Sequence, residues 1–162
     1  WTLAVRDTLS DLDPAHAEAY AANAAAYVAA LQSLVDGELW PLVESLPAAD
    51  RVLVTQHGSL GYFAAAFGFD VIGVVIPGGS TIAEPSAAEV AAIIDTVRAA
   101  GVPAVFAETT SNPDLVEQIA RETGASFHTL YTGSLSEVDG PASTYLDYMR
   151  YNVGTIVTAL SR

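Results

Sequence analysis

The first third of the chain places apolar residues at the spacing of helices. The segment Thr2–Leu12 is compatible with a short helix, and the alanine-rich segment 15–35 predicts a long one. Asp13 and Pro14 supply a cap and a first-turn proline for this second helix. A glycine and a proline then disturb the pattern, and a shorter helical stretch runs to about Leu46.

Beyond residue 46, short β-branched runs alternate with helical segments. This alternation predicts an α/β fold, in which a long helix is followed by a four-stranded parallel sheet with helices on both faces. We expect two parts, an N-terminal helical segment at 1–46 and a (β/α)4 unit at 47–162. The predicted strands are 51–55, 70–76, 104–107 and 126–131, and the predicted helices are 59–67, 86–100, 112–124 and 141–160.

Composition and charge narrow the classes of function. Hydrophobic residues make up 51% of the 162 positions and charged residues 15%, which is enough apolar material for one well-buried core. The net charge of −13, with arginine as the only strong cation, argues strongly against nucleic acid as a partner and also against anionic lipid. Since cysteine is absent, a zinc site would have to use histidine, aspartate, glutamate or water. The chain begins inside a predicted helix, so we expect a fragment.

Candidate ligands follow the predicted strands. In open parallel sheets, ligands bind beyond the carboxyl ends of the strands. His57 follows the first strand, Glu108 the third, and Glu137 and Asp139 lie in the loop after the fourth. One imidazole and up to three carboxylates therefore converge on one predicted edge, and neutral imidazole suits zinc and other transition metals.

Each candidate has a simpler interpretation. A histidine in this position is often a hydrogen-bonded loop residue, and a carboxylate such as Glu108 often caps a helix or pairs with an arginine. His16 and His128 are predicted to be structural. The glycine-rich segment 77–80 could cradle an anion, but it lacks the lysine and spacing of a phosphate loop, and we interpret it as a turn. No nucleophile-and-base pair or cofactor loop indicates an enzyme.

Several segments of the sequence form a set of motifs in a recognisable order. Residues 55–68 read TQHGSLGYFAAAFG and residues 80–86 read STIAEPS. In this order they resemble the T-x-H-x-A-[FY]-x-Y-F…[YF]-G and S…E-P-S motifs of the zinc/manganese substrate-binding (TroA-like, ZnuA-like) family of ABC transporters. Further similar positions are Asp13-Pro14 with Tyr20, Asn23 and Tyr27, Phe106 to Glu108, Leu130 to Leu135, and Thr144-Tyr145 with Met149 and Asn152.

The resemblance implies a specific architecture and metal site. Such proteins have two α/β lobes joined by a rigid long helix, hold the metal between the lobes and deliver it to a membrane permease. The C-terminal lobe supplies a His or Glu after its first strand, which His57 matches, and an Asp after its last strand. Gly133 stands at that Asp position, so Glu137, Asp139, Glu108 or water would have to substitute. The imidazole favours Zn²⁺ over Mn²⁺.

The resemblance also sets expectations about partners. We expect the C-terminal lobe of a periplasmic or otherwise extracytoplasmic solute-binding protein, with an ABC permease and the missing N-terminal lobe as partners. An apolar face left bare by that lobe would favour homo-oligomers. The alternative is a metal-binding-deficient fragment or relative that acts as a surface interaction domain of the adhesin kind, and Gly133 favours this alternative.

Overall fold

The structure is a computed structural model that describes residues 1–76 and 85–161. It divides into two compact units, Trp1–Pro41 and Leu42–Arg162, and each is described by itself. The turn predicted at 77–80 and most of the segment 80–86 lie outside the described residues. The division predicted between residues 46 and 47 stays a prediction. Among the described helices, none is both long and apolar enough to cross a membrane.

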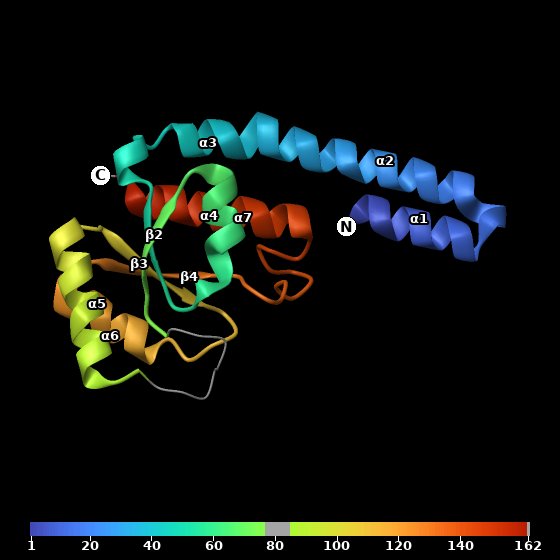
Figure 1. Cartoon of the computed structure of the whole chain (residues 1–162). Helices are drawn as coiled ribbons and strands as arrows, with labels where there is room; N and C mark the ends of the chain where they lie inside the picture. Colours follow the sequence, from blue (N-terminus) through green and yellow to red (C-terminus); the bar gives the residue numbers. More distant parts are fainter. Residues whose placement is uncertain (77–84, 162) are drawn as a thin grey trace. The chain divides into compact units, whose positions relative to one another are not determined.

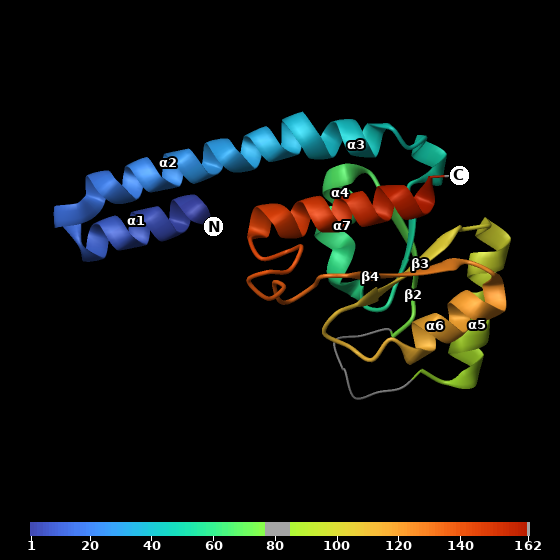
Figure 2. The same ribbon diagram turned by 180° about the vertical axis from the view of Figure 1, so that it is seen from behind.

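The first unit is a helical hairpin. Helix α1 spans Thr2–Leu12, a 3-10 turn spans Pro14–His16, and α2 spans Ala17–Leu34. The two helices lie side by side in Figures 1 and 2. Asp13 holds the turn, because its Oδ2 accepts a hydrogen bond from the Tyr20 hydroxyl at 2.9 Å and lies 2.7 Å from His16 Nδ1.

Helix α2 ends in a widened turn, which corresponds to the disturbance predicted near the proline. Residues Val35–Leu39 form a π-helical turn, and α3 follows at Trp40–Glu44. Pro41 lies in the first turn of α3 and has no amide N–H to donate to the preceding turn. π turns are rare in proteins and occur mostly as single turns within longer helical segments, as this one does.

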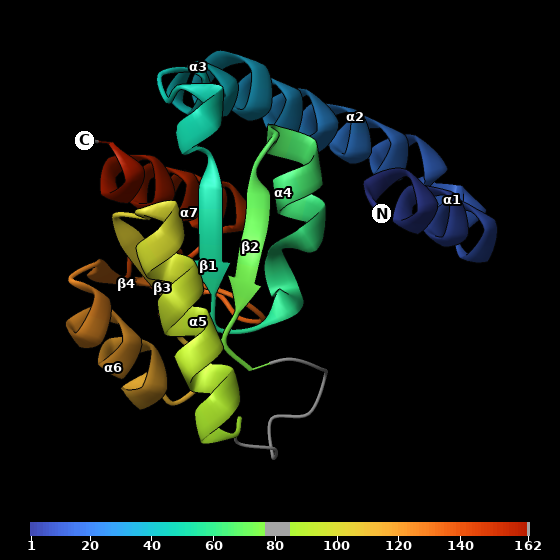
Figure 3. The same cartoon turned by 60° about the vertical axis from the view of Figure 1, so that its left-hand side comes forward.

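The second unit contains the predicted four-stranded parallel sheet. The strands are β1 (Val52–Thr55), β2 (Asp70–Val74), β3 (Ala104–Glu108) and β4 (Ser126–Leu130). They pair in the order β2-β1-β3-β4, and every pairing is parallel. The predicted α/β class is therefore confirmed. Figure 3 shows the arrowheads of β1 and β2 at the same edge of the sheet.

Four helices cover the two faces of this sheet. They are α4 (Gly61–Phe67), α5 (Ala87–Ala100), α6 (Asp114–Thr123) and α7 (Tyr145–Leu160). Helices α4 and α7 lie on one face, and α5 and α6 lie on the other (Figures 1 and 3). Two 3-10 turns, Ala48–Asp50 and Gly58–Leu60, precede β1 and α4.

The last helix begins later than the residue pattern predicts. We predicted a start at residue 141, whereas α7 begins at Tyr145. Thr144 is the residue that decides this boundary, because its hydroxyl accepts a hydrogen bond from the Asp147 amide at 3.2 Å and so caps the helix.

The core of the second unit is built around β3. All five residues of this strand are buried, since helices cover both of its faces. Helices α6 and α7 each bury an apolar stripe, which includes Val116 and Ile119 from α6 and Val153 and Ile156 from α7. The carboxyl ends of β1 and β3 are thereby held in a rigid frame.

Candidate metal-binding site

The strand order creates a switch point at the carboxyl ends of β1 and β3. From β1 the chain passes through α4 to β2 on one side, whereas β3 and β4 lie on the other side. The connections that leave β1 and β3 therefore cover opposite faces of the sheet, and such a divergence is where open α/β sheets bind ligands. His57 is the second residue after β1, and Glu108 is the last residue of β3.

His57 and Glu108 meet at this switch point. His57 Nδ1 lies 3.6 Å from Glu108 Oε1, and the two side chains keep 15% and 10% of their exposed surface. A carboxylate this deeply placed needs hydrogen-bond donors. The hydroxyls of Ser59 and Thr132 supply them, donating to Oε1 and Oε2 respectively, each at 2.6 Å.

The side chain of Gln56 links the end of β1 to the end of β3 and the loop that follows it. Its side chain is completely buried. Its Oε1 accepts a hydrogen bond from the Glu108 amide at 3.0 Å, and its Nε2 donates to the Asn112 carbonyl at 2.6 Å. The backbone of His57 is fixed as well, because the Thr55 hydroxyl donates to its carbonyl at 2.8 Å. Both candidate side chains therefore stand on backbone that side-chain hydrogen bonds hold in place.

The loop after β4 contributes Thr132 to this cluster. Gly133, the next residue, is exposed and has a positive φ of 71°. Glu137 and Asp139 are exposed further along the loop. Within the described ranges, no three or more His, Cys, Asp or Glu side chains are grouped to hold one metal ion. The structure thus brings His57 and Glu108 together, and it does not add Glu137 or Asp139 to a shared group with them.

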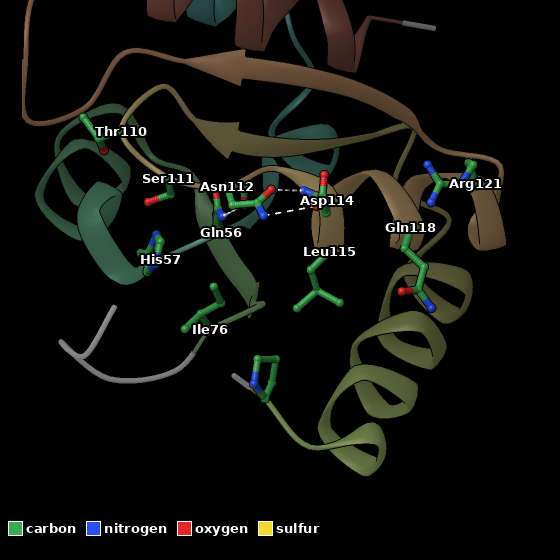
Figure 4. A pocket seen from close by; sticks show the side chains of 11 residues that line it. Gln56, His57, Ile76, Thr110, Ser111, Asn112, Asp114, Leu115, Gln118 and Arg121 are labelled. Atoms are coloured by element: carbon green, nitrogen blue, oxygen red, sulfur yellow. Dashed lines mark hydrogen bonds between the residues drawn. The ribbon is translucent and has the colours of Figure 1, made fainter. Parts of the chain in front are cut away.

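A polar cavity of ≈ 710 Å³ opens beside His57. Figure 4 shows His57 at one end of it and Arg121 at the other. Its remaining lining comes mainly from the β3–α6 loop and α6, together with residues that follow β1 and β2 and precede α5: Gln56, Ile76, Pro85, Thr110, Ser111, Asn112, Asp114, Leu115 and Gln118. His57 is therefore reachable from solvent-filled space, as a metal ligand must be.

Tyr148 of α7 lies within the electrostatic reach of the same cluster. Burial raises the pKa of its phenol, and the neighbouring Tyr145 and the charge of Glu108 raise that pKa further. The tyrosine is consequently neutral at physiological pH.

The other two histidines contact residues outside the His57 cluster. His16 lies against Asp13, and His128 Nε2 lies 3.0 Å from the Ser126 hydroxyl while its ring contacts Phe106. These contacts agree with the structural roles that the sequence indicated.

Sequence reasoning did not identify Gln56, Ser59 and Thr132 as parts of this cluster. A signal for Gln56 was available, because a glutamine that directly follows a buried strand must find internal hydrogen-bond partners. The two hydroxyl residues gave no such signal, since their partner lies 49 and 24 residues away along the chain.

Comparison with known proteins assigns the family. Residues 1–159 match the family described as zinc-uptake complex component A, periplasmic (ZnuA). The chain belongs to this family. The match covers both units of the structure, and it confirms the resemblance found in the motifs.

Relatives in the ZnuA family carry the names of different metals. The chain is 34% identical to the manganese-binding lipoprotein MntA of Halalkalibacterium halodurans over 98% of its own length and 52% of that protein. It is 35% identical to the iron-binding protein YfeA of Yersinia pestis, over 94% of the chain and 48% of that protein. The solved structure of the periplasmic zinc-binding protein TroA from Treponema pallidum superposes with a TM-score of 0.87 at 30% identity, covering 98% of this chain and 58% of TroA.

These matches show which part of a ZnuA-family protein the chain corresponds to. The chain spans about half the length of the curated relatives it matches. Its sheet and helices correspond to one lobe of a TroA-like solute-binding protein. The three names refer to manganese, iron and zinc, so the relatives do not point to one metal. None of them supports the adhesin-like alternative.

Proposed function

We propose that this chain is the C-terminal lobe of an extracytoplasmic protein that binds a divalent metal ion and delivers it to an ABC importer. Support comes from the family match over residues 1–159 and from relatives named for metal binding, one of them a lipoprotein and one periplasmic. The metal is cargo, and the proposed role of the protein is that of a carrier. The acidic surface, at a net charge of −13, attracts cations and repels nucleic acid.

His57 is the proposed metal ligand of this lobe, and its placement carries the proposal. It stands at the switch point between β1 and β3, borders the cavity and lies beside a buried carboxylate. Among the described residues, no hydrogen-bond partner is placed on its Nε2. A neutral imidazole with one nitrogen facing a carboxylate and the other open is the arrangement in which histidine binds transition metals.

Zinc is the proposed cargo, in preference to manganese. Imidazole nitrogen suits zinc, whereas manganese favours carboxylate and water oxygen. This choice rests on His57 as the family's strand-end ligand, because the relatives themselves are named for different metals.

The chain supplies only part of a complete zinc site. Protein zinc sites use three or four protein ligands in tetrahedral geometry. His57 provides one, and Gly133 cannot provide the expected aspartate. We propose that the missing N-terminal lobe supplies two further ligands in the whole protein. In the isolated chain, Glu137, Asp139, water or a second copy of the chain would complete the coordination.

A calorimetric zinc titration of this chain tests the proposal. We expect micromolar or tighter binding, and we expect His57→Ala to weaken it by more than about 100-fold, the upper end of what loss of an outer partner costs. His16→Ala is the matched control, because His16 is also a histidine beside a carboxylate but belongs to the other unit. Equal loss in both variants, or none in His57→Ala, would contradict the assignment of His57.

A further inference from the structure

Both side-chain oxygens of Glu108 are already occupied by hydrogen bonds. The Ser59 hydroxyl donates to Oε1 and the Thr132 hydroxyl donates to Oε2, each at 2.6 Å. Distances this short are typical of hydroxyl-to-carboxylate hydrogen bonds. Glu108 is itself only 8% exposed. Its orientation is therefore fixed from two sides by residues of two different loops, one after β1 and one after β4.

The fixed carboxylate faces one nitrogen of His57. At 3.6 Å, the separation of Nδ1 from Oε1 is too long for a hydrogen bond, but it is short enough for strong electrostatic interaction in a partly buried site. A negative charge favours a ring N–H dipole that points toward it, and it disfavours a nitrogen lone pair in that direction. The proton of the neutral imidazole is consequently favoured on Nδ1, which leaves the lone pair on Nε2.

We propose that Glu108 is a positioning residue for His57, which selects the Nδ1–H tautomer and so presents Nε2 to the metal ion. Ser59 and Thr132 are part of the same device, because their hydroxyls prevent the carboxylate from turning away. The tautomer preference stands on the geometry of the metal-free chain. The consequence for metal affinity rests on the proposed function.

Direct ligation by Glu108 is the competing role, and the surroundings disfavour it. To ligate the metal, the carboxylate would have to turn an oxygen toward it. The hydrogen bonds from Ser59 and Thr132 oppose that rotation. The backbone amide of Glu108 is also bound by buried Gln56, so the strand end cannot shift to help. An outer carboxylate that orients a ligating histidine needs no such rearrangement.

The first test measures the tautomer of His57 without any metal. Nitrogen-15 NMR of the imidazole ring distinguishes a protonated Nδ1 from a protonated Nε2 at a pH where the ring is neutral. We expect His57 of the unaltered chain to be predominantly Nδ1–H, and we expect Glu108→Gln to raise the Nε2–H population at least several-fold. Glu117→Gln is the matched control, since Glu117 is half-exposed on α6 and pairs with Arg121. An unchanged tautomer ratio in Glu108→Gln would overturn the inference.

The second test separates positioning from ligation. We would titrate zinc into a Ser59→Ala/Thr132→Val variant, in which Glu108 is intact but no longer held. Positioning predicts that zinc affinity falls by about 10- to 100-fold, as it does for other outer partners of metal-bound histidines. Direct ligation predicts unchanged or tighter binding, because the two competing donors are gone. That second result would overturn the inference.

The two tests also separate this inference from the proposed function. If His57→Ala leaves zinc binding intact, the proposed ligand is wrong, whereas the tautomer measurement still reports on Glu108. If His57→Ala abolishes binding while Glu108→Gln changes neither the tautomer nor the affinity, the proposed function stands and the positioning role fails. Circular dichroism of each variant would establish that the sheet is retained.

Discussion

Replacing Gly133 with aspartate is expected to tighten zinc binding to this chain by at least about tenfold, since even outer partners of metal ligands change affinity by 10- to 100-fold. Position 133 directly follows Thr132, whose hydroxyl binds Glu108, and Glu108 in turn lies beside His57. The resemblance to the family places a ligating aspartate at this position. A second protein ligand next to the imidazole would raise the coordination number that the chain can offer.

The backbone at position 133 tolerates the change at modest cost. Gly133 has a φ of 71°, a left-handed conformation that costs non-glycine residues about 1–2 kcal/mol, and aspartate and asparagine adopt it more readily than most. A Cβ added there would meet Thr110 Cγ2 at 3.8 Å, which is an ordinary contact. We therefore expect Gly133→Asp to fold.

Gly133→Asn is the matched control for this gain. It has the same size and the same backbone strain, but it lacks the negative charge that favours a metal ligand. Calorimetric zinc titration of both variants should show the gain for aspartate alone. Equal affinities for the two variants, at or below that of the unaltered chain, would show that position 133 does not face the metal bound by His57.

Replacing Gln56 with leucine is expected to lower the free energy of unfolding by about 2–4 kcal/mol, because a buried amide would lose its partner and a second hydrogen bond would disappear. Gln56 is fully buried, and its side chain binds the Glu108 amide and the Asn112 carbonyl. Leucine has a similar size, so the loss would come from unsatisfied polar groups with little contribution from a cavity. Urea unfolding would measure it.

Gln118→Leu provides the comparison for Gln56→Leu. Gln118 is exposed on α6, and its side chain donates to Glu122 on the surface at 2.8 Å. Surface substitutions of this kind usually change stability by less than about 0.5 kcal/mol. If both variants lost the same stability, the role assigned to Gln56 in joining β1 to β3 would be wrong.

The fold was largely predictable because each helix and strand has a recognisable residue pattern within its own segment of the sequence. Short β-branched runs alternate with helical segments, and such alternation leads to a parallel sheet. The order β2-β1-β3-β4 was not predictable in the same way, because it depends on how the strands pair after the helices pack. The start of α7 was missed for a related reason, since the cap at Thr144 outweighs the proline at 141.

The candidate site was predictable only where a residue's place in the chain determines its place in the sheet. His57 and Glu108 follow or end strands, so their shared edge can be inferred from the sequence alone. The bonds from Ser59 and Thr132 to Glu108 depend on β1, β3 and β4 lying in this order. Long-range hydrogen bonds of this kind leave no local pattern in the sequence.

Metal choice is a property of the donor atoms and not of the fold. Relatives of similar identity are named for manganese and for iron, and a superposable structure is named for zinc. An imidazole in place of a carboxylate at the strand end changes only one side chain, yet it changes the metal ion that the donor atoms favour. On the proposed function, the donor atoms around His57 would carry the specificity that the fold leaves open.

The most direct measurement is a zinc titration of the isotopically labelled chain, followed by nitrogen-15 NMR of its three histidine rings. We predict that zinc shifts the Nε2 signal of His57 and leaves those of His16 and His128 in place. A shift confined to His16 or His128, or no shift of His57 at zinc concentrations that saturate the calorimetric titration, would contradict the assignment of His57 as the metal ligand of this lobe.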